Sequence, residues 1–590
     1  MHTNLRSFIN QLKNEKELIE ITAEADPYLE IPEIHRRVID EQGPALLFTN
    51  VKNNDTPVVT NLFGTVRRLD MAFGPKPEAF VKQAIGALDK LMPPTISSLW
   101  NEKSLFTDVM KLGTKTVSKA HAPVAGIYSP DVDMRTLPAL TGWQHDSGPF
   151  VTLPLVYTEH PENNAHNLGM YRIEIREQTP AQTGIHWQIH KGGGFHHYEA
   201  EQRNEALPVS LFIGGPPALM ISAIAPIPPF VPELMFSSFL MGKKLTMFEV
   251  ENHPHKLVAE AEFAFAGSVP PHVRKPEGPF GDHYGYYSLE HDFPVLDIKQ
   301  MWKRKDAIYP ATVVGKPYQE DFYIAEYLQR LLRPFYPLVM SGVKDLQAYG
   351  ETGVHALTGA IVRESYYKEG LTHAIRILGE GQLSLTKFLM VTSKDVDLQQ
   401  FHELLEAVLE RFLPERDLLI MTDTSMDTLD YTGRSLNVGS KAIMTGLGDP
   451  IRTLARTYTG GHIDNIRDAI PFCGGCLVVS GPAFSEHEDF AQWLVDHAQE
   501  ALGDWQLVFL VDDASIAESQ NRFLWTTFTR FDPAHDLYAK ADIVRNNVRY
   551  RGPIVIDSRM KPFYPEEVVV DEEVAQKVDA RWKDYFPRGY

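Results

Sequence analysis

Two eight-residue segments with one shared pattern lie 119 residues apart (530 − 411) in the last third of the chain. Residues 411–418 and 530–537 both read Arg-Phe-x-Pro-x-x-Asp-Leu. At the same offset, a predicted strand at 388–391 falls on one at 507–510, and a helix near 398–411 falls on one near 517–530. A period this long indicates a duplicated domain rather than a solenoid. The sequence therefore predicts two α/β modules with one topology, within residues 353–450 and 451–565.

The rest of the 590-residue chain divides by the type of element that its hydrophobic pattern predicts. Residues 1–120 alternate helices and strands, which indicates an N-terminal α/β domain. Residues 121–315 contain short strands separated by Gly and Pro, a pattern typical of a barrel or sandwich. The predicted strands include 169–176, 184–190, 209–214, 218–224, 245–250, 257–266 and 295–302. A helical region at 316–352 links this part to the modules, and a helical tail at 566–590 is expected to pack on another subunit. The fold class is thus a multidomain protein of α/β and β parts.

The stretch from Asn167 to Gly194 carries an amide, a guanidinium and two imidazoles on one predicted hairpin. Residues 170–175 and 185–190 alternate apolar and polar side chains, so they can pair as antiparallel strands. Lys191 and the three glycines after it give a backbone that can lie against a phosphate, with a cation beside it.

Three motifs in this chain resemble the signature stretches of the UbiD-type decarboxylases. They are NLGMYR at 167–172, HWQIHKGGG at 186–194 and PEGPFGDHYGYY at 276–287. The likeness extends from the opening LRSFINQLKNEKELIEI to DAIYPATVVGKP at 306–317. It implies a central split β-barrel related to flavin reductases, prenylated FMN as cofactor, and a flavin prenyltransferase that supplies it. Family members have one C-terminal module, so the second copy would explain the length of this chain.

The resemblance also implies a divalent metal that bridges to the cofactor phosphate, held by Asn167, His190 and Glu233. Oxygen ligands with one imidazole suit Mn²⁺, and K⁺ is expected nearby. Spacing alone supports this set weakly, and Glu233 after Pro232 also reads as an ordinary acid at a helix start. The cofactor contacts implied by the resemblance are Asn167, Met170, Tyr171, Arg172, His186, Trp187, Gln188, His190, Lys191, Gly192 and Glu233.

Arg172, Glu277 and Asp282 are the predicted catalytic residues. Taken alone, the stretch from Glu277 to His283 reads as a solvent-facing turn with capping carboxylates. The resemblance instead implies an acid, arginine and acid network beside the flavin. In this network we expect Arg172 to pair mainly with Glu277, while burial raises the pKa of Asp282 so that it can donate a proton.

One stretch departs from the family pattern. Family members often have Gly-His-Ala-Lys where this chain has Gly370-Leu371-Thr372-His373. If that lysine contacts the cofactor phosphate, another residue must do so here.

These observations predict a reversible, non-oxidative decarboxylase that releases CO₂ from an aryl, hydroxyaryl or α,β-unsaturated acid in ubiquinone or menaquinone biosynthesis. Loss of CO₂ leaves an sp² carbanion, which an electron-accepting cofactor must stabilise. One alternative is an FMN-dependent oxidoreductase on the same barrel, which needs no acid loop. Another is a flavin-carrier or assembly subunit, which would tolerate the loss of Glu277 and Asp282.

Composition limits the partners. The formal charge of −20 argues against nucleic acid, because phosphate binding needs a basic face. The N-terminus reads as an amphipathic helix and not as a signal peptide, and no apolar run is long enough for a transmembrane segment. We expect a cytoplasmic homodimer or larger homo-oligomer, peripheral at the membrane if its substrate carries an isoprenoid tail.

Overall fold

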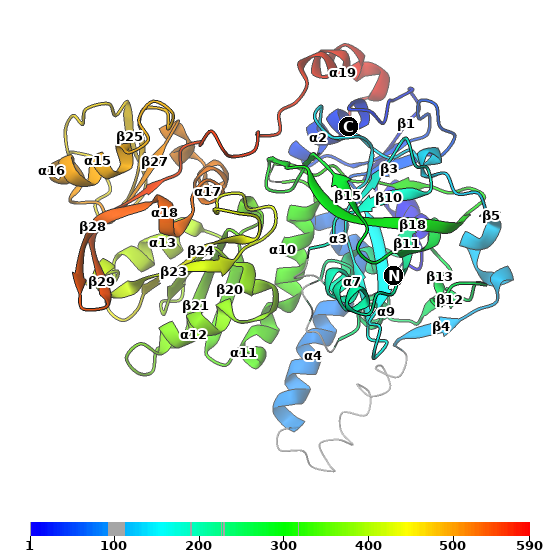
Figure 1. The fold of residues 1–590 in the computed structure, drawn as a ribbon, viewed down its shortest axis with the longest axis horizontal. Helices are drawn as coiled ribbons and strands as arrows, with labels where there is room; N and C mark the ends of the chain where they lie inside the picture. The colour runs from blue at the N-terminus through cyan, green and yellow to red at the C-terminus, as the bar shows by residue number, and fades with distance from the viewer. Residues whose placement is uncertain (1, 92–111, 189–191, 226, 228–230, 317) are drawn as a thin grey trace. The chain divides into compact units, whose positions relative to one another are not determined.

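The computed structural model describes residues 2–91, 112–188, 192–225, 227, 231–316 and 318–590 (Figure 1). Its contacts divide the chain into two compact units. The first comprises residues 1–331 and 567–590, and the second comprises residues 332–566. No helix in the described ranges combines the length and the apolar character that a membrane span requires.

The first unit begins with a small α/β layer. Helix α1 (Leu5–Asn14) buries Leu5, Phe8, Ile9 and Leu12, which share one face because they recur every three to four residues. The layer also contains α2 (Glu30–Asp40), α3 (Val66–Phe73), α4 (Lys76–Leu91), β1 (Leu18–Ile21), β2 (Ala45–Phe48) and β3 (Val58–Thr60). The sheet order is β1-β2-β3-β19. Strand β19 (Tyr309–Pro310) comes much later in the sequence than the other three strands.

A ten-stranded sheet forms the centre of the first unit. Its main path runs β6-β9-β10-β18-β14-β11-β7-β8, and β5 and β15 pair with β18 beside that path. The strands are β5 (Ile127–Ser129), β6 (Phe150–Val151), β7 (Pro154–Glu159), β8 (His166–Gly169), β9 (Ile173–Ile175), β10 (Gln182–Ile185), β11 (Leu207–Ile213), β14 (Phe263–Val269), β15 (Arg274–Glu277) and β18 (His291–Lys303). Pairings among the described residues do not close this sheet into a barrel, so the split barrel stays a prediction.

Three local expectations were wrong. The strand expected at 184–190 ends at Ile185. Helix α7 (Gly192–Gln202) follows and begins at the first of the three glycines. The strand expected at 169–176 is interrupted, because β8 ends at Gly169 and β9 begins at Ile173. The strand expected at 218–224 is helix α8 (Pro217–Ser222), which begins with a proline, a favoured residue in the first helical turn.

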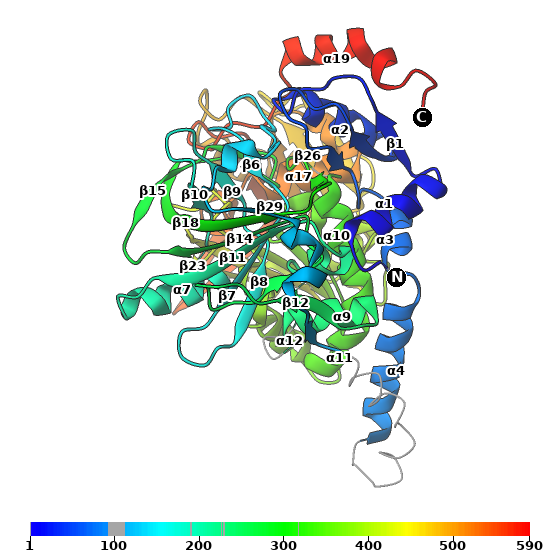
Figure 2. The same ribbon diagram turned by 90° about the vertical axis from the view of Figure 1, so that its right-hand side faces the viewer.

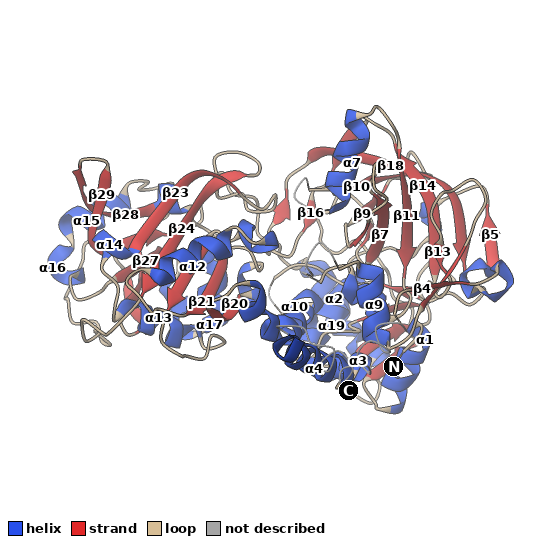
Figure 3. Cartoon of the chain, turned by 90° about the horizontal axis from the view of Figure 1, so that it is seen from below, coloured by secondary structure: helices blue, strands red, loops and turns tan. Residues whose placement is uncertain are grey.

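The second unit holds two five-stranded sheets with the same strand order. One runs β20-β21-β22-β24-β23 and the other β25-β26-β27-β29-β28. In both, the successive pairings are antiparallel, parallel, parallel and antiparallel. The strands of the first sheet are β20 (Val343–Ala348), β21 (Leu357–Val362), β22 (Phe388–Thr392), β23 (Leu418–Ser425) and β24 (Val438–Gly446). The strands of the second are β25 (Asp468–Cys473), β26 (Cys476–Ser480), β27 (Leu507–Val511), β28 (Leu537–Val544) and β29 (Asn547–Asp557). Figure 3 shows these strands in red with helices beside them.

The C-terminal tail returns to the first unit. Helix α19 (Glu572–Tyr585) packs on α2 of its own chain (Figures 1 and 2), and its expected contact with another subunit stays a prediction. Lys577 Nζ donates to Glu30 Oε2 at 2.8 Å, and the side chains of Arg581 and Tyr585 contact the other Glu30 oxygen. Glu30 is only 2% exposed, so α19 supplies the partners of a buried carboxylate.

Candidate active site

Arg172 joins the two predicted catalytic acids in one buried network. Its Nε donates to Glu277 Oε1 at 2.7 Å and its Nη2 to Glu277 Oε2 at 2.8 Å, which makes a bidentate pair. Its Nη1 contacts Asp282 Oδ2, and Nη2 also donates to Ser288 Oγ at 2.9 Å. The side chain of Arg172 is 7% exposed and that of Glu277 is fully buried. The structure therefore brings together all three residues that the motifs pointed to.

Adjacent strands position this network. Arg172 immediately precedes β9, Glu277 ends β15, and Asp282 follows the short strand β16 (Phe280–Gly281). Strand β18 pairs with both β10 and β15, and β10 pairs with β9. Gly184 of β10 lies between Glu277 and a further carboxylate, Glu174 of β9. A Cβ on Gly184 would be 3.0 Å from Glu174 Oε2 and 3.1 Å from Glu277 Cγ. The sheet thus holds an arginine and two carboxylates from distant parts of the chain in contact.

Burial and ion pairing act in opposite directions on these acids. Burial raises the pKa of Glu277, but Arg172 and then His186 outweigh it and lower that pKa to about 2. Burial also raises the pKa of Asp282, yet Arg172 and His283 hold it below its ordinary value. The Nδ1 of His283 lies 2.7 Å from Asp282 Oδ1. The expected raised pKa of Asp282 is therefore wrong for this arrangement, because Arg172 contacts both acids and not mainly Glu277.

Asp146 is a third acid at this site, and no sequence motif indicated it. Its Oδ1 accepts a hydrogen bond from Gly281 N at 2.7 Å, and its Oδ2 accepts from Gly142 N and Trp143 N, each at 2.9 Å. Burial raises the pKa of Asp146 to about 6, although the three backbone donors oppose this. Asp146 therefore anchors Gly281, the last residue of β16, which directly precedes Asp282 and lies 135 residues further along the chain.

We expect Asp146→Ala to lower the free energy of unfolding by about 1–3 kcal/mol, because three backbone N–H groups lose their acceptor. Asp146→Asn keeps one acceptor oxygen and should lose less. Chemical denaturation at pH 7.5 measures both. An alanine variant as stable as the unsubstituted protein would show that these hydrogen bonds do not stabilise the loop.

A second group of side chains surrounds the first turn of α7. Asn167 Nδ2 and Gly193 N each donate to Tyr171 Oη at 3.2 Å. The rings of Tyr171 and Trp187 meet edge to face at 6.4 Å. A Cβ on Gly192 would lie 2.1 Å from Asn167 Oδ1, so the glycine allows this close approach. The start of an eleven-residue helix beside an amide and two aromatic rings is suited to an anionic group of a ligand.

Glu233 lies close to this group. It is the first residue of α9 (Glu233–Met241), and its carboxylate accepts from the N–H of Leu168, the residue after Asn167. Burial raises the pKa of Glu233. The structure therefore places two of the three predicted metal ligands near one another, one on β8 and one at the start of α9.

The remaining predicted site residues divide by what the structure describes. His190 and Lys191 lie outside the described residues. Met170 is half-buried beside Tyr171. Within the described ranges no three His, Cys, Asp or Glu residues are placed to hold a metal, and the predicted set contributes only Glu233 to such a count. His373, at the position of the family lysine, lies in the second unit on α12 (Glu369–Leu378), with its Nε2 3.4 Å from Glu369 Oε1.

Four buried polar atoms near these residues have no hydrogen-bond partner in the described part of the chain. They are His186 Nε2, Trp187 Nε1, Gln188 Oε1 and Glu233 Oε2. Buried polar atoms in folded proteins are nearly always hydrogen-bonded, so each of these four needs an explanation. A bound polar ligand that forms hydrogen bonds with all four atoms would explain them.

Three family models match consecutive parts of the chain. The N-terminal, Rift-related and C-terminal domains of 3-octaprenyl-4-hydroxybenzoate carboxy-lyase match residues 9–88, 115–317 and 322–446. The chain belongs to the UbiD family. UbiD family members are decarboxylases, and the Rift-related match contains every residue of the candidate site. The C-terminal match ends at residue 446, before the second five-stranded sheet begins.

Relatives and solved structures agree with this assignment. The chain is 50% identical over 585 residues to a 4-hydroxybenzoate decarboxylase subunit of Chlamydia pneumoniae, a match that covers 99% of this chain and 98% of the relative. Vanillic acid decarboxylase of Sedimentibacter hydroxybenzoicus in its closed form is 21% identical, with a TM-score of 0.68, and covers 79% of this chain and 96% of its own. The UbiD-class enzyme HmfF of Pelotomaculum thermopropionicum, in complex with FMN, is also 21% identical, with a TM-score of 0.62 and coverage of 78% and 97%. The mixed α/β multidomain fold is thus that of the UbiD-class decarboxylases.

Proposed function

We propose that this chain is a prenylated-FMN-dependent decarboxylase that removes CO₂ from an aryl or hydroxyaryl carboxylic acid, with a hydroxybenzoate as the preferred substrate. The observation that carries the proposal is the buried contact of Arg172 with both Glu277 and Asp282, next to the unpartnered polar atoms. The name of the Chlamydia pneumoniae relative supports a hydroxybenzoate. HmfF, which shares the fold, has been solved with FMN and with prenylated FMN. A place in quinone biosynthesis stays a prediction.

The residues present fit such a cofactor. Asn167 and Glu233 supply oxygens for a divalent ion such as Mn²⁺, and the start of α7 supplies backbone N–H groups for a phosphate. The unpartnered atoms of His186, Trp187 and Gln188 offer hydrogen bonds to a polar ring system. K⁺ would be a second cation near the phosphate.

When bound, prenylated FMN would supply the electron sink that an sp² carbanion requires. The chain's own residues then have to hold and move a proton. Arg172 keeps Glu277 ionised and holds Asp282 against the same guanidinium. A substrate carboxylate near Asp282 would raise the pKa of that acid by like-charge repulsion and let its carboxyl take up a proton. Asp282 would give this proton to the carbon that loses CO₂.

The cofactor mass tests the proposal most directly. We expect protein co-expressed with a flavin prenyltransferase to release prenylated FMN on denaturation, and to liberate CO₂ from a hydroxybenzoate. Protein from cells without the prenyltransferase is the control and should not turn over. Unmodified FMN in both preparations, together with reductase activity, would favour the FMN-dependent oxidoreductase instead.

Glu233→Ala should reduce the divalent metal content of the cofactor-loaded protein, because it removes the one carboxylate among the predicted ligands. Elemental analysis after gel filtration measures metal per chain. Glu249→Ala, which removes an exposed carboxylate, is the matched control and should keep the metal. Equal metal content in the Glu233 variant and the unsubstituted protein would remove Glu233 from the ligand set.

A further inference from the structure

The two sheets of the second unit share strand register as well as strand order. Below, the first module is residues 343–446 and the second module is residues 468–557. Equivalent residues differ by 123 in the first strands, β20 and β25, by 119 in the second to fourth strands, and by 112 in β24 and β29. The matching register pairs are Leu357 with Phe388 and Cys476 with Leu507, then Leu418 with Met444 and Leu537 with Ile556.

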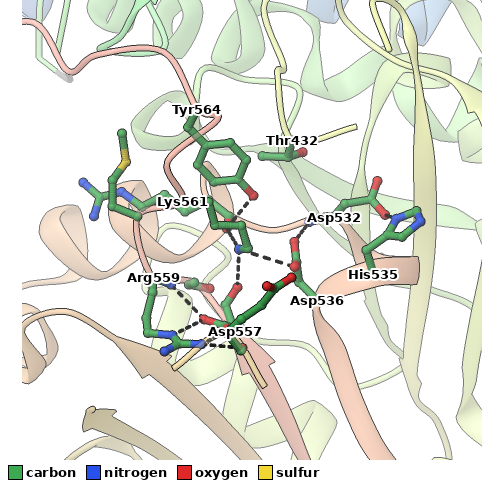
Figure 4. A network of polar contacts seen from close by, with 12 residues as sticks. Thr432, Asp532, His535, Asp536, Asp557, Arg559, Lys561 and Tyr564 are labelled. Carbon is green, nitrogen blue, oxygen red and sulfur yellow. Dashed lines mark hydrogen bonds and ion pairs between the residues drawn. The ribbon is translucent and has the colours of Figure 1, made fainter. Parts of the chain in front are cut away.

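The repeated sequence motif forms the same local structure in both modules. In the first, Asp417 Oδ2 accepts from Leu413 N at 2.9 Å across the short helix α14 (Pro414–Asp417). In the second, Asp536 Oδ2 accepts from Asp532 N at 2.7 Å across α18 (Pro533–Asp536). Figure 4 shows Asp536 in a buried network, where Lys561 Nζ lies 3.4 Å away. The two modules are thus equivalent down to individual hydrogen bonds.

Contacts between the modules are reciprocal. Helix α18 of the second touches β24 of the first, where Ser440 Oγ donates to Asp532 Oδ1 at 2.6 Å. Conversely, α14 of the first touches β29 of the second, where a Cβ on Gly552 would lie 3.9 Å from Pro414 Cγ. Ser440 and Gly552 are equivalent positions, 112 residues apart. Each module therefore uses the same elements to contact the other.

A second reciprocal set lies nearby. Helix α13 (Phe401–Leu409) touches β25, and its equivalent α17 (Gln520–Phe528) touches the short helix η5 (Gly350–Thr352), which directly follows β20, the equivalent of β25. Phe401 and Gln520, themselves equivalent, contact each other: Phe401 N donates to Gln520 Oε1 at 2.8 Å. Residues that meet their own equivalents lie on a two-fold axis. This is the isologous pattern of a symmetric dimer, here within one chain.

We propose that the second module is a built-in partner of the first: it covers a self-association surface that would otherwise bind a second copy of the first module. This pairing surface consists of α13, α14, β24 and η5. Beside this surface, Phe388 of β22 packs on the second module, with its ring 5.8 Å from that of Phe528 and 5.7 Å from that of Phe531, an apolar contact of the kind found in permanent interfaces. The proposal does not depend on the proposed function.

A cut in the loop between the modules tests the proposal in the full chain. A specific protease site is inserted after Gly461. This glycine is exposed, and a Cβ added to it would have no neighbouring atom within 4 Å. We expect the cut protein to keep the mass of the uncut protein in light scattering, because the interface holds the fragments together. A second protease site after Glu566 leaves residues 567–590, with α19, on the first unit, so that only fragment 462–566 is removed. After separation in mild denaturant and refolding, fragment 1–461 with this retained tail should contain twice as many chains per particle as the uncut protein. Adding fragment 462–566 back should return it to the original mass.

Ser440→Arg separates this result from other causes of association. In a pair of first modules, position 440 would face Leu413 and Glu415 of the second copy, the equivalents of Asp532 and Ala534. The variant therefore also carries Glu415→Gln, so that its arginine meets no unpaired carboxylate there. In the uncut chain the same arginine lies beside Asp532. We therefore expect the two substitutions to prevent the doubling of fragment 1–461 while the uncut variant keeps its mass. Fragment 1–461 that stays undoubled without the substitutions, or doubles equally with them, would overturn the proposal.

Discussion

Asp282→Asn is expected to reduce decarboxylation by roughly 10²–10⁴-fold, the usual effect of losing a general acid. Asparagine keeps the shape of the side chain and can still meet Arg172, but it cannot give up a proton at the reacting carbon. Because Glu277 remains in its bidentate pair with Arg172, we expect the fold, the cofactor and the metal to be retained. CO₂ release and solvent-hydrogen exchange into a product analogue should fall together.

Asp292→Asn is the matched control, since Asp292 is an exposed aspartate on β18 opposite β15, and it should turn over normally. If Asp282→Asn decarboxylates at close to the original rate, the proton donor is another group. Glu277 would then be the next residue to replace. If loss of either acid changes nothing, the chain is a flavin carrier or an assembly subunit.

Arg172→Leu should cost about 3–5 kcal/mol of unfolding free energy at pH 7.5, because it leaves Glu277 and Asp282 buried without their cation. Activity should be lost as well. Chemical denaturation measures the effect on stability. Arg135→Leu removes an exposed arginine paired with Asp133 and should change stability little.

The loss of unfolding free energy in Arg172→Leu should become smaller as the pH falls. With Arg172 present, the pKa values of Glu277 and Asp282 are lowered, so their stabilising contribution is complete above the unfolded value near ~4.3 and is lost only in stronger acid. Without Arg172, burial, the largest influence on both acids, is opposed only by His186 and His283, so we expect both pKa values to rise and the folded state to bind protons more tightly than the unfolded state. The stability gap between variant and unsubstituted protein should therefore narrow from pH 7.5 to pH 5.5. A gap that stays constant would mean that the two acids are not buried charges.

The sequence predicted the pairing of β9 with β10 because strict alternation over a few residues favours one half-buried strand arrangement, and Ile173 does lie opposite Ile185. It failed at 218–224, where nearly every residue is apolar and a buried helix cannot be told from a buried strand. The modules were easier to find, because each contains helices and strands in the same order. Their shared register could not be seen, since it depends on pairing between distant strands.

At the candidate site, the motifs pointed to Arg172, Glu277 and Asp282, and the structure places all three in contact. The direction of the pKa shift of Asp282 was missed because it depends on which oxygens the guanidinium reaches. Asp146 was missed for a different reason: it acts through the backbone N–H of Gly281, a group that every residue except proline carries. Contacts to backbone leave no pattern in the sequence.

Because α19 belongs to the first unit but follows the second unit in the sequence, the first unit is synthesised in two separate parts. Residues 332–566 must leave the ribosome before the last element of the first unit does, so the nascent chain holds Glu30 without Lys577, Arg581 and Tyr585 while the second unit is being made. Domains generally fold as they emerge, N-terminal part first. The second unit can therefore complete its fold before the first, and the final ion pairs of the first unit form only after the second unit has been synthesised.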